Sequence, residues 1–97
     1  MLKTRKFDVA ELLDDESEVQ AFLDEAATSG DAAAFVHALG IAARAKGMTE
    51  VARAAGVTRA SLYKSLADGG NPQFETIFKV CRALGVRLAA IPEMAAH

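Results

Sequence analysis

The side chains best suited to binding chemistry in this chain fall on the outward positions of one short predicted helix. These positions hold Arg59, Ala60, Tyr63 and Lys64. The planar fork of an arginine can bind the O6 and N7 atoms of guanine together, which discriminates between bases by about 1–3 kcal/mol. Lysine and tyrosine side chains suit the DNA backbone and the groove wall, where contacts position a protein without reading sequence. We therefore predict that Arg59 reads DNA bases; its alternative role is that of an exposed, solubilising cation.

Two short helices joined by a tight turn are predicted over residues 48–66, and they would hold this face in place. Thr49 is placed to cap the first helix, because its hydroxyl can accept a hydrogen bond from an unpaired backbone N–H. Gly56 would end that helix, since a residue without a Cβ adopts the left-handed turn at least cost, and Thr58 would cap the second helix. The apolar residues that would pack the two helices inward are Val51, Ala52, Ala55, Leu62 and Leu66. This pattern is typical of a helix-turn-helix, which lays its second helix in the DNA major groove; the alternative is a structural helical hairpin.

Further polar residues around this unit complete the predicted DNA-binding surface. For each lysine or arginine that contacts a phosphate, the logarithm of the DNA-binding constant would fall by about 0.9 per unit of log salt concentration. The alternative is that these side chains only form solvated, exposed helix faces. One helix-turn-helix of this size contacts few base pairs. Sequence specificity would therefore require a twofold dimer on a palindromic DNA site with half-sites about 34 Å apart. The predicted DNA-binding residues are Arg44, Lys46, Thr49, Arg53, Thr58, Arg59, Ala60, Tyr63 and Lys64.

Composition limits the chain to one small fold. Its 97 residues leave room for a single core, and we predict one domain over residues 1–97. Much of the 52% hydrophobic share is alanine, which favours close-packed helices. The single cysteine excludes an intramolecular disulfide and a cysteine-based zinc site. No apolar run approaches the roughly 20 residues of a membrane span and no secretory leader opens the chain, so we expect a cytoplasmic protein without a membrane partner.

A net charge of −2 conceals a strong asymmetry along the chain. Residues 8–31 carry nine acidic side chains and no lysine or arginine, whereas residues 32–97 hold eight lysines and arginines against four acids, a net charge of +4. Carboxylates repel the DNA backbone, so the acidic segment should face away from a bound duplex. The alternative interpretation of this segment is an ordinary solvated helix face, whose acids suit the positive end of the helix dipole.

Acidic N-terminal helices are predicted over residues 8–47 from hydrophobic spacing and end signals. Asp31 is placed to cap the last of them. Gly40 lies in the middle of that helix, where glycine costs about 1 kcal/mol relative to alanine, so we expect another helix to pass close to it. The predicted elements are one helical turn at 8–13, a helix at 16–29 and a helix at 32–46. Their predicted inward residues are Val19, Phe22, Leu23, Ala26, Ala27, Phe35, Leu39, Ala42 and Ala43.

A closing helix is predicted over residues 72–84, with Asn71 as its N-cap and Pro72 at its first position, where the missing N–H costs nothing. Its predicted core face consists of Phe74, Ile77, Phe78, Cys81 and Leu84. Beyond this helix, alternating side chains predict a short strand at 86–91. A lone strand leaves backbone groups unpaired, so we expect it to pair with residues 4–7 or with its own copy in a second subunit. The predicted fold is all-α, with five to six helices and this short C-terminal strand.

Nothing in the sequence predicts catalysis. His37 and His97 are isolated and are not spaced as metal ligands. No glycine-rich phosphate loop or nucleophile motif is present. Cys81 is expected to be a small core residue rather than a reactive thiol. We therefore expect a protein that is not an enzyme, with no catalytic residues, metal site or cofactor.

The run GMTEVARAAGVTRASLYKSLADGGNPQFETIFKVCRALGVRL, with the acidic segments before it, resembles the probable addiction module antidote proteins, HigA-like antitoxins within the phage-repressor (Cro-like) helix-turn-helix superfamily. The most diagnostic pieces are SLYKSL, the NP-x-F-x-T element at residues 71–76, and RALGVRL. The resemblance implies a repressor-like helix-turn-helix domain, homodimerisation, repression of its own operon and neutralisation of a small RelE/ParE-like toxin. Glu50 stands where such sequences often have glutamine, and its carboxylate would repel a phosphate.

The resemblance gives the acidic segment a second interpretation. Toxins of this type are usually basic, which makes Asp14, Asp15 and Glu18 candidate toxin-binding residues. The leading hypothesis is thus a dimeric repressor that binds double-stranded operator DNA and also acts as the antitoxin of a small basic toxin. The alternatives are a stand-alone helix-turn-helix repressor without a toxin, and a protein-interaction module that binds no DNA.

Overall fold

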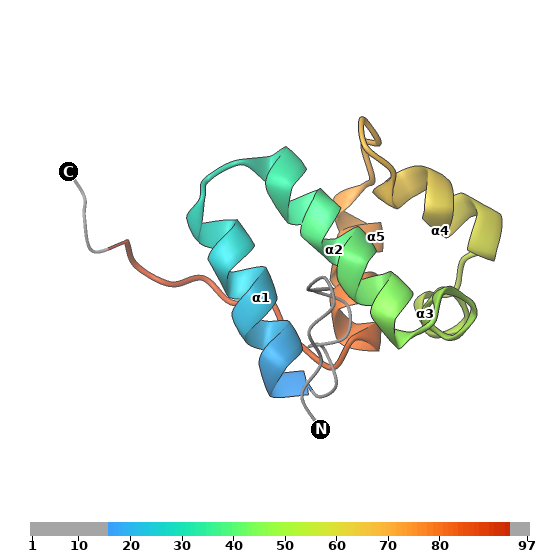
Figure 1. Cartoon of the computed structure of the whole chain (residues 1–97), viewed down its shortest axis with the longest axis horizontal. Helices are drawn as coiled ribbons and strands as arrows, with labels where there is room; N and C mark the ends of the chain where they lie inside the picture. The colour runs from blue at the N-terminus through green and yellow to red at the C-terminus, as the bar shows by residue number, and fades with distance from the viewer. Residues whose placement is uncertain (1–15, 94–97) are drawn as a thin grey trace, which may run out of the picture.

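The computed structural model describes residues 16–93, and within this range it contains five α-helices and no β-strand. The all-α class predicted from the sequence is therefore confirmed for this part of the chain. The predicted turn at 8–13 and the segment 4–7 lie outside the described residues. The helices are α1 (Glu16–Thr28), α2 (Ala32–Lys46), α3 (Met48–Ala55), α4 (Arg59–Leu66) and α5 (Phe74–Ala83) (Figure 1).

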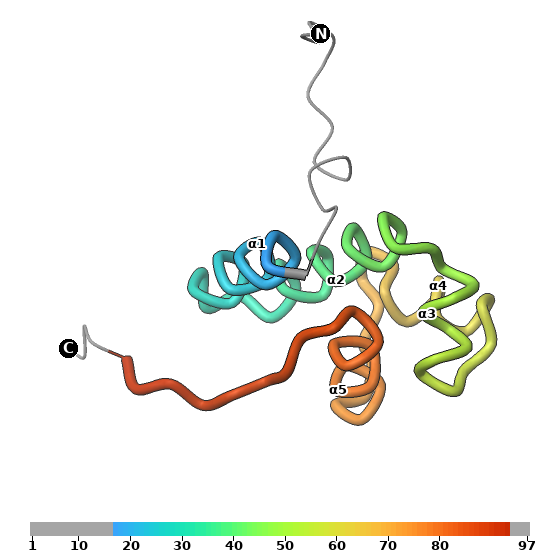
Figure 2. The backbone as a smooth tube through the Cα atoms, turned by 90° about the horizontal axis from the view of Figure 1, so that it is seen from below, coloured from blue at the N-terminus to red at the C-terminus, as the bar shows by residue number. Residues whose placement is uncertain are grey.

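Helix α2 is the central element, because each of the other four helices packs against it. Helix α1 lies on one side of α2 and helix α4 on the other, with α3 joining α4 through a tight turn (Figure 1). The perpendicular view shows the same separation of α1 from the α3–α4 pair (Figure 2). Helix α5 packs mainly against α3 and completes the core. The acidic helix α1 and the α3–α4 pair are thus held apart by α2.

The spacing of apolar residues in α1 and α2 predicts their buried faces well. Asp31 caps α2 as expected, since its side chain accepts a hydrogen bond from the backbone N–H of Ala33 at 3.1 Å. Of the predicted inward residues, Val19, Leu23, Leu39, Ala42 and Ala43 are buried, and Phe22, Ala26 and Phe35 are partly buried. The prediction for Ala27 is wrong, because this side chain is exposed. Helix α1 packs chiefly against α2, so only a narrow stripe of its surface is covered.

The expected close approach at Gly40 is confirmed. A Cβ atom added to Gly40 would lie 3.2 Å from the backbone oxygen of Leu66 and 3.7 Å from its Cβ. The end of α4 therefore rests on the backbone of α2 at this point. The absence of a side chain at Gly40 lets the two helices come this close.

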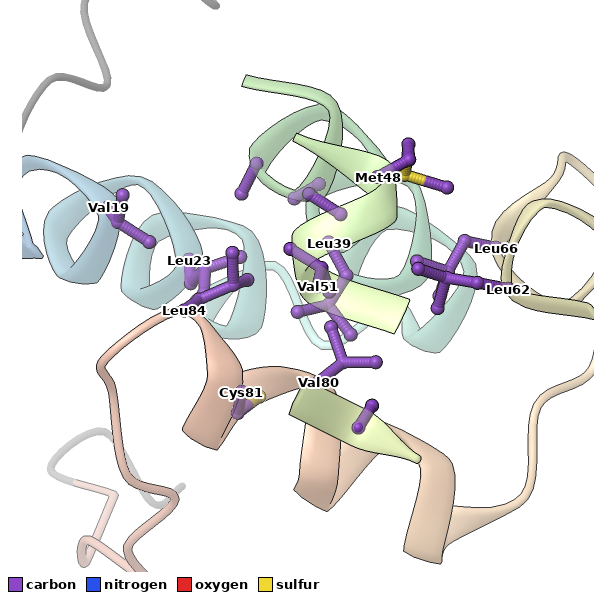
Figure 3. Close-up of a cluster of buried hydrophobic side chains, with 14 of the residues drawn as sticks. Val19, Leu23, Leu39, Met48, Val51, Leu62, Leu66, Val80, Cys81 and Leu84 are labelled. Atoms are coloured by element: carbon purple, nitrogen blue, oxygen red, sulfur yellow. The ribbon is translucent and has the colours of Figure 1, made fainter. Parts of the chain in front are cut away.

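One hydrophobic core connects the five helices. At its centre Leu39 of α2, Val51 of α3 and Val80 of α5 meet, and Leu62 and Leu66 enter it from α4 (Figure 3). Leu62 is 0% exposed and Leu66 is 3% exposed, as their spacing predicts. Among the described residues no polar or charged side chain is buried. Hydrophobic burial is consequently what fixes α4 against the rest of the fold.

The caps of the α3–α4 pair are partly as predicted. Gly56 has the left-handed conformation (φ 75°) after α3, and the hydroxyl of Thr58 accepts a hydrogen bond from the backbone N–H of Ser61 at 3.0 Å. The predicted cap at Thr49 is wrong, because α3 begins at Met48 and Gly47 takes the N-cap position. The carbonyl of Gly47 accepts the first helical hydrogen bond, from the N–H of Val51 at 2.9 Å. Thr49 therefore lies inside the helix, and its hydroxyl is available to another partner.

Helix α5 begins two residues later than predicted. Its N-cap position is Gln73, whose carbonyl accepts a hydrogen bond from the N–H of Ile77 at 3.1 Å, and no side chain caps it. Asn71 and Pro72 lie in the preceding loop rather than at the helix start. The helix also ends one residue earlier than predicted, because Leu84 is its C-cap.

The predicted core face of α5 is correct for three of its five residues. Cys81 and Leu84 are each 1% exposed, and Ile77 is partly buried. Phe74 and Phe78 are 70% and 39% exposed, so placing them in the core was wrong. The helix carries two overlapping apolar stripes, and the stripe that contains Ile77 and Leu84 is the one that α2 and α3 cover.

The predicted strand at 86–91 is absent from the structure. These residues form an extended segment without assigned secondary structure. Val86 and Leu88 are partly buried and pack on the core, whereas Arg87 and Ala89 are exposed. The alternation therefore reflects one-sided packing of a single segment. It does not reflect pairing with a neighbouring strand within the described residues.

We predict that Leu62→Ala lowers the free energy of unfolding by about 2–5 kcal/mol, because it leaves a cavity under α4. The neighbouring change Ser61→Ala, on an exposed position of the same helix, should alter it by no more than about 0.5 kcal/mol. Urea denaturation followed by circular dichroism measures both values. Similar losses in the two variants would contradict the placement of α4 described above.

Candidate nucleic-acid interface

Arg59 is the first residue of α4, and its guanidinium group has partners from two helices. One terminal nitrogen donates a hydrogen bond to the hydroxyl of Thr49 in α3 at 3.3 Å, and the other donates to the hydroxyl of Tyr63 at 3.4 Å. The central carbon of the guanidinium also lies 5.5 Å from the centroid of the Tyr63 ring, within cation–π range. Both partners are uncharged, so they orient the arginine without neutralising it.

These contacts of Arg59 are not among the sequence predictions. The Thr49 hydroxyl, predicted to cap α3, instead accepts a hydrogen bond from the side chain that begins α4. The contact with Tyr63 spans four residues within one helix, a spacing at which side chains meet, so the sequence alone contains a signal for it. The contact with Thr49 depends on how α3 and α4 cross, and the sequence contains no comparable signal.

A shallow hollow adjoins the oriented guanidinium. It lies where the end of α2 and the beginnings of α3 and α4 come together, and its lining includes two arginines, a threonine hydroxyl and a tyrosine. Two cations and two hydroxyl groups make this hollow chemically suited to an anion. The residues that line it are Arg44, Gly47, Met48, Thr49, Arg59 and Tyr63.

The outward face of α4 is exposed as predicted. Ala60, Tyr63 and Lys64 are exposed, whereas Leu62 and Leu66 of the same helix are buried. Ala60 has no side chain beyond its Cβ, so a flat surface can come close to the helix backbone there. The face as a whole presents positive charge at both ends and an aromatic hydroxyl beside Arg59.

The flanking cations surround this face on two helices. Arg44 and Lys46 are exposed in the last turn of α2, and Arg53 is exposed in the last turn of α3. Arg53 follows Thr49 by four residues and therefore shares its side of α3. Glu50 is exposed in the first turn of the same helix and is the one acid within α3. The structure thus gathers the predicted DNA-binding residues around the α3–α4 pair, with one carboxylate among them.

The acidic surface lies on the opposite side of α2. Glu18, Asp24 and Glu25 are exposed on α1, which has no lysine or arginine. Asp14 and Asp15, the other two candidates for toxin binding, lie outside the described residues. Since α1 and α4 flank α2 on different sides (Figure 1), the molecule carries opposite charge on two separated surfaces.

His37 has a partner that its isolation in the sequence did not indicate. Its Nδ1 lies 3.0 Å from a carboxylate oxygen of Asp68, and both side chains are exposed. The pair links α2 to the loop between α4 and α5. Within the described residues no group of three or more His, Cys, Asp or Glu side chains could hold a metal ion. No helix in this range is long and apolar enough to cross a membrane.

The sequence model of the family described as "probable addiction module antidote protein" matches residues 3–92. A protein of Haemophilus influenzae (strain Rd), named only as an uncharacterized protein, is 43% identical over 83 residues, which cover 86% of each chain. No solved structure matches the chain significantly.

Cys81 is the remaining side chain with reactive chemistry, and the structure places it in the core. Its side chain is 1% exposed, and its neighbour Val80 in α5 is also buried. Burial disfavours the charged thiolate and raises the pKa of the Cys81 thiol from 9.0 to about 11. The thiolate is the reactive form, so burial and the raised pKa both disfavour reaction of Cys81 in the folded protein.

We predict that the Cys81 thiol of the native protein is alkylated by iodoacetamide far more slowly at pH 9 than the same thiol in urea. At this pH about half of an ordinary thiol with a pKa of 9.0 is ionised, whereas only a small fraction of a thiol with a pKa of about 11 is. Because the folded pKa is raised, the thiol also contributes stability below pH 9 that is lost as the pH rises toward 11. Mass spectrometry follows the alkylation, and equal rates in both states would contradict the buried position.

Proposed function

The chain belongs to the family of probable addiction module antidote proteins, and we propose that it is the antitoxin of a toxin–antitoxin pair and represses its own operon by binding DNA. In this proposal the α3–α4 pair is a helix-turn-helix of the phage-repressor type, and α4 is its recognition helix. The observation that carries the proposal is the oriented, un-neutralised guanidinium of Arg59 at the exposed start of α4. The protein would act in the cytoplasm as a regulator and not as an enzyme.

Base reading is assigned to Arg59. Its hydrogen bonds to Thr49 and Tyr63 are long, at 3.3 and 3.4 Å, and are therefore weak. They restrict the side chain before DNA arrives but leave most of its five N–H groups free for a guanine edge. Such preorganisation lowers the entropy cost of binding.

The remaining residues of the surface would position the duplex. Ala60 permits close approach of α4 to the base edges, and Tyr63 and Lys64 would contact the groove wall and the backbone. Thr49 and Thr58 supply hydroxyl groups near the start of each helix. The phosphate contacts are assigned to the flanking cations Arg44, Lys46 and Arg53. Glu50 would repel a phosphate, so we assign no backbone contact to its position.

The separation of charge suggests where the toxin would bind. Acidic helix α1 would be repelled by DNA and would thus remain exposed when α4 is in the groove. A basic RelE/ParE-like toxin would be attracted to this surface, where Glu18 is exposed. Asp14 and Asp15, the other two proposed toxin-binding residues, lie outside the described residues. Because α1 and α4 flank α2 on different sides, one chain has room for both partners. A homodimer would place two recognition helices on a palindromic operator with half-sites about 34 Å apart.

We predict that Arg59→Ala removes most of the preference for the promoter of this gene over random DNA. Loss of one bidentate guanine contact costs about 1–3 kcal/mol of discrimination. Arg59→Lys should lose the same preference but keep salt-dependent binding, because it retains the charge and lacks the planar fork. Fluorescence anisotropy with a salt titration measures both.

Arg87→Ala is the matched control for charge, since Arg87 is exposed in the segment that follows α5. We expect this variant to bind the promoter as the wild type does. Wild-type protein that binds promoter and random DNA equally would overturn the proposed repressor function.

We predict that reversing the charge of Asp14, Asp15 and Glu18 to lysine weakens binding to the proposed small basic toxin by at least tenfold. The matched control reverses three acids outside the acidic segment, namely Glu50, Asp68 and Glu93, and changes the net charge equally. Isothermal titration calorimetry with the purified partner separates the two variants. An equal loss of affinity in the two variants would assign the attraction to net charge rather than to this surface. No loss of affinity in either variant would contradict toxin binding by the acidic residues.

A further inference from the structure

A groove runs between α1 and the extended segment that follows α5, which passes back along α1 (Figure 2). Its volume is about 190 Å³ and its lining is mainly apolar. The apolar side chains include Leu23 of α1, Phe35 of α2, and Leu88 and Ile91 of the extended segment. Ile91 is 72% exposed, although burial of a large aliphatic side chain is favourable. The groove is thus an apolar surface that residues 16–93 leave uncovered.

The groove continues to the beginning of α1. A second hollow there is lined by Ser17 and Gln20 of α1 and by four residues of the segment 85–89. Gln20 and three of these four residues also line the groove, so the two hollows form one continuous surface, which we call the α1 groove. Helix α1 begins at Glu16, so the residues before it reach the described part of the molecule at this end of the α1 groove.

The chain before α1 is long enough to cover the α1 groove. From Ser17 to Ala27 the helix rises about 15 Å, at about 1.5 Å per residue. An extended chain advances about 3.3 Å per residue, so about five residues would span this distance, and a helical return would need about ten. Fifteen residues precede Glu16, which leaves residues for a turn in either case.

The residues within this reach are apolar enough to fill the α1 groove. Residues 7–13 read FDVAELL, in which Phe7, Val9, Leu12 and Leu13 are large apolar residues. An apolar cavity of about 150 Å³ can hold a benzene molecule, so a groove of about 190 Å³ has room for a phenylalanine ring. Docking would remove from water both these side chains and the uncovered lining of the groove.

We propose that residues 7–13 fold back into the α1 groove of their own chain. The segment enters beside Ser17, so Leu13 lies near that end and Phe7 lies farther along, toward Ile91. It therefore runs opposite to residues 86–91, which line the α1 groove from the Ser17 end toward the Ala27 end. The inference depends on neither DNA nor toxin binding, and it goes beyond the proposed function by assigning a partner to the segment after α5.

The order of the charges agrees with this direction. Arg87 lines both hollows, is exposed and has no ion-pair partner among residues 16–93. Glu11 comes shortly before α1 in the chain and would reach Arg87. Asp24 is exposed and lines the more distant part of the α1 groove, where Lys6 would arrive beside Phe7.

The covalent link to α1 favours this segment over the same segment of a second copy. A short flexible linker gives a tethered segment an effective concentration in the millimolar range. A second copy would have to be present at that concentration to compete equally. Docking should consequently be independent of protein concentration.

The first experiment places a fluorescent reporter on the segment of the full-length protein. The chain has no tryptophan, so Phe7→Trp introduces a single indole and keeps a large aromatic ring at this position. We expect its emission at shorter wavelength, and its quenching by acrylamide at least about twofold weaker, than in urea. Adding Ile91→Asp should expose the indole. Phe74→Asp is the matched control, because Phe74 is 70% exposed on α5, and it should leave the quenching unchanged.

A charge exchange in the same Phe7→Trp background tests the direction of docking. Arg87→Glu and Glu11→Arg each bring like charges together and should increase the quenching, though less than Ile91→Asp, because an exposed ion pair contributes little. The double variant should restore the original value. Combining Arg87→Glu with Glu75→Arg gives the same net charge and should restore nothing, since Glu75 pairs with Lys79 on α5.

A second measurement is independent of the introduced indole. Phe7→Ser and Ile91→Ser should each increase the equilibrium constant of unfolding. The double variant should increase it by less than the product of the two factors, because both substitutions remove the same contact. Phe7→Ser combined with Phe74→Ser is the control, and its two factors should multiply. Urea denaturation followed by circular dichroism measures all of these constants.

Four results would overturn the inference. The first is an indole as accessible in the native protein as in urea, and the second is an indole that becomes protected only when the proposed basic toxin is added. The third is protection that rises with protein concentration, which would place the segment on a second copy. The fourth is a set of independent factors for Phe7→Ser and Ile91→Ser. None of these measurements uses DNA, so the anisotropy experiment on Arg59 tests the proposed function separately.

Discussion

The orientation of the candidate DNA-binding face depends on the backbone contact between α2 and α4. Gly40 has no side chain, and the carbonyl oxygen of Leu66 lies close to its backbone. A Cβ atom at this position would be only 3.2 Å from that oxygen. This contact seats Leu62 and Leu66 in the core and turns the opposite side of α4 to solvent. A bulky residue at Gly40 would push α4 outward and separate Arg59 from its partner in α3. The packing of α4 on α2 therefore determines which side chains of α4 are exposed.

The same packing separates the two charged surfaces of the molecule. Helix α1 contributes acids and no cations, whereas the described cations are distributed over α2 to α5 and the segment after them. Since α2 lies between α1 and the α3–α4 pair, the acids of α1 are kept away from the candidate DNA-binding surface, where Glu50 is the one carboxylate of α3. This arrangement places surfaces of opposite charge on two sides of one set of packed helices. It also explains how a chain with a net charge of −2 can present a basic face.

Much of the fold could be predicted because its signals are local. Apolar spacing gave the five helices to within two residues at each end, and the cap at Thr58 and the left-handed turn at Gly56 follow from the chemistry of single side chains. The outward face of α4 also follows from the sequence, because the burial of Leu62 and Leu66 determines which residues point away. Even the close helix contact at Gly40 could be inferred, since an unfavourable glycine inside a helix indicates a packing reason.

The sequence by itself thus determined the helices, their buried stripes in α1 to α4 and the residue types of the candidate site. Only the tertiary structure decided that Thr49 orients Arg59, because residues on two helices meet through the angle at which those helices cross. It also decided that Phe74 and Phe78 stay exposed, since α5 has two apolar stripes and its neighbours cover one of them. Apolar and polar side chains alternate over residues 86–91 as in a strand, but the segment forms none. A β-strand needs a neighbouring strand for its backbone hydrogen bonds, and an alternating sequence does not provide that neighbour.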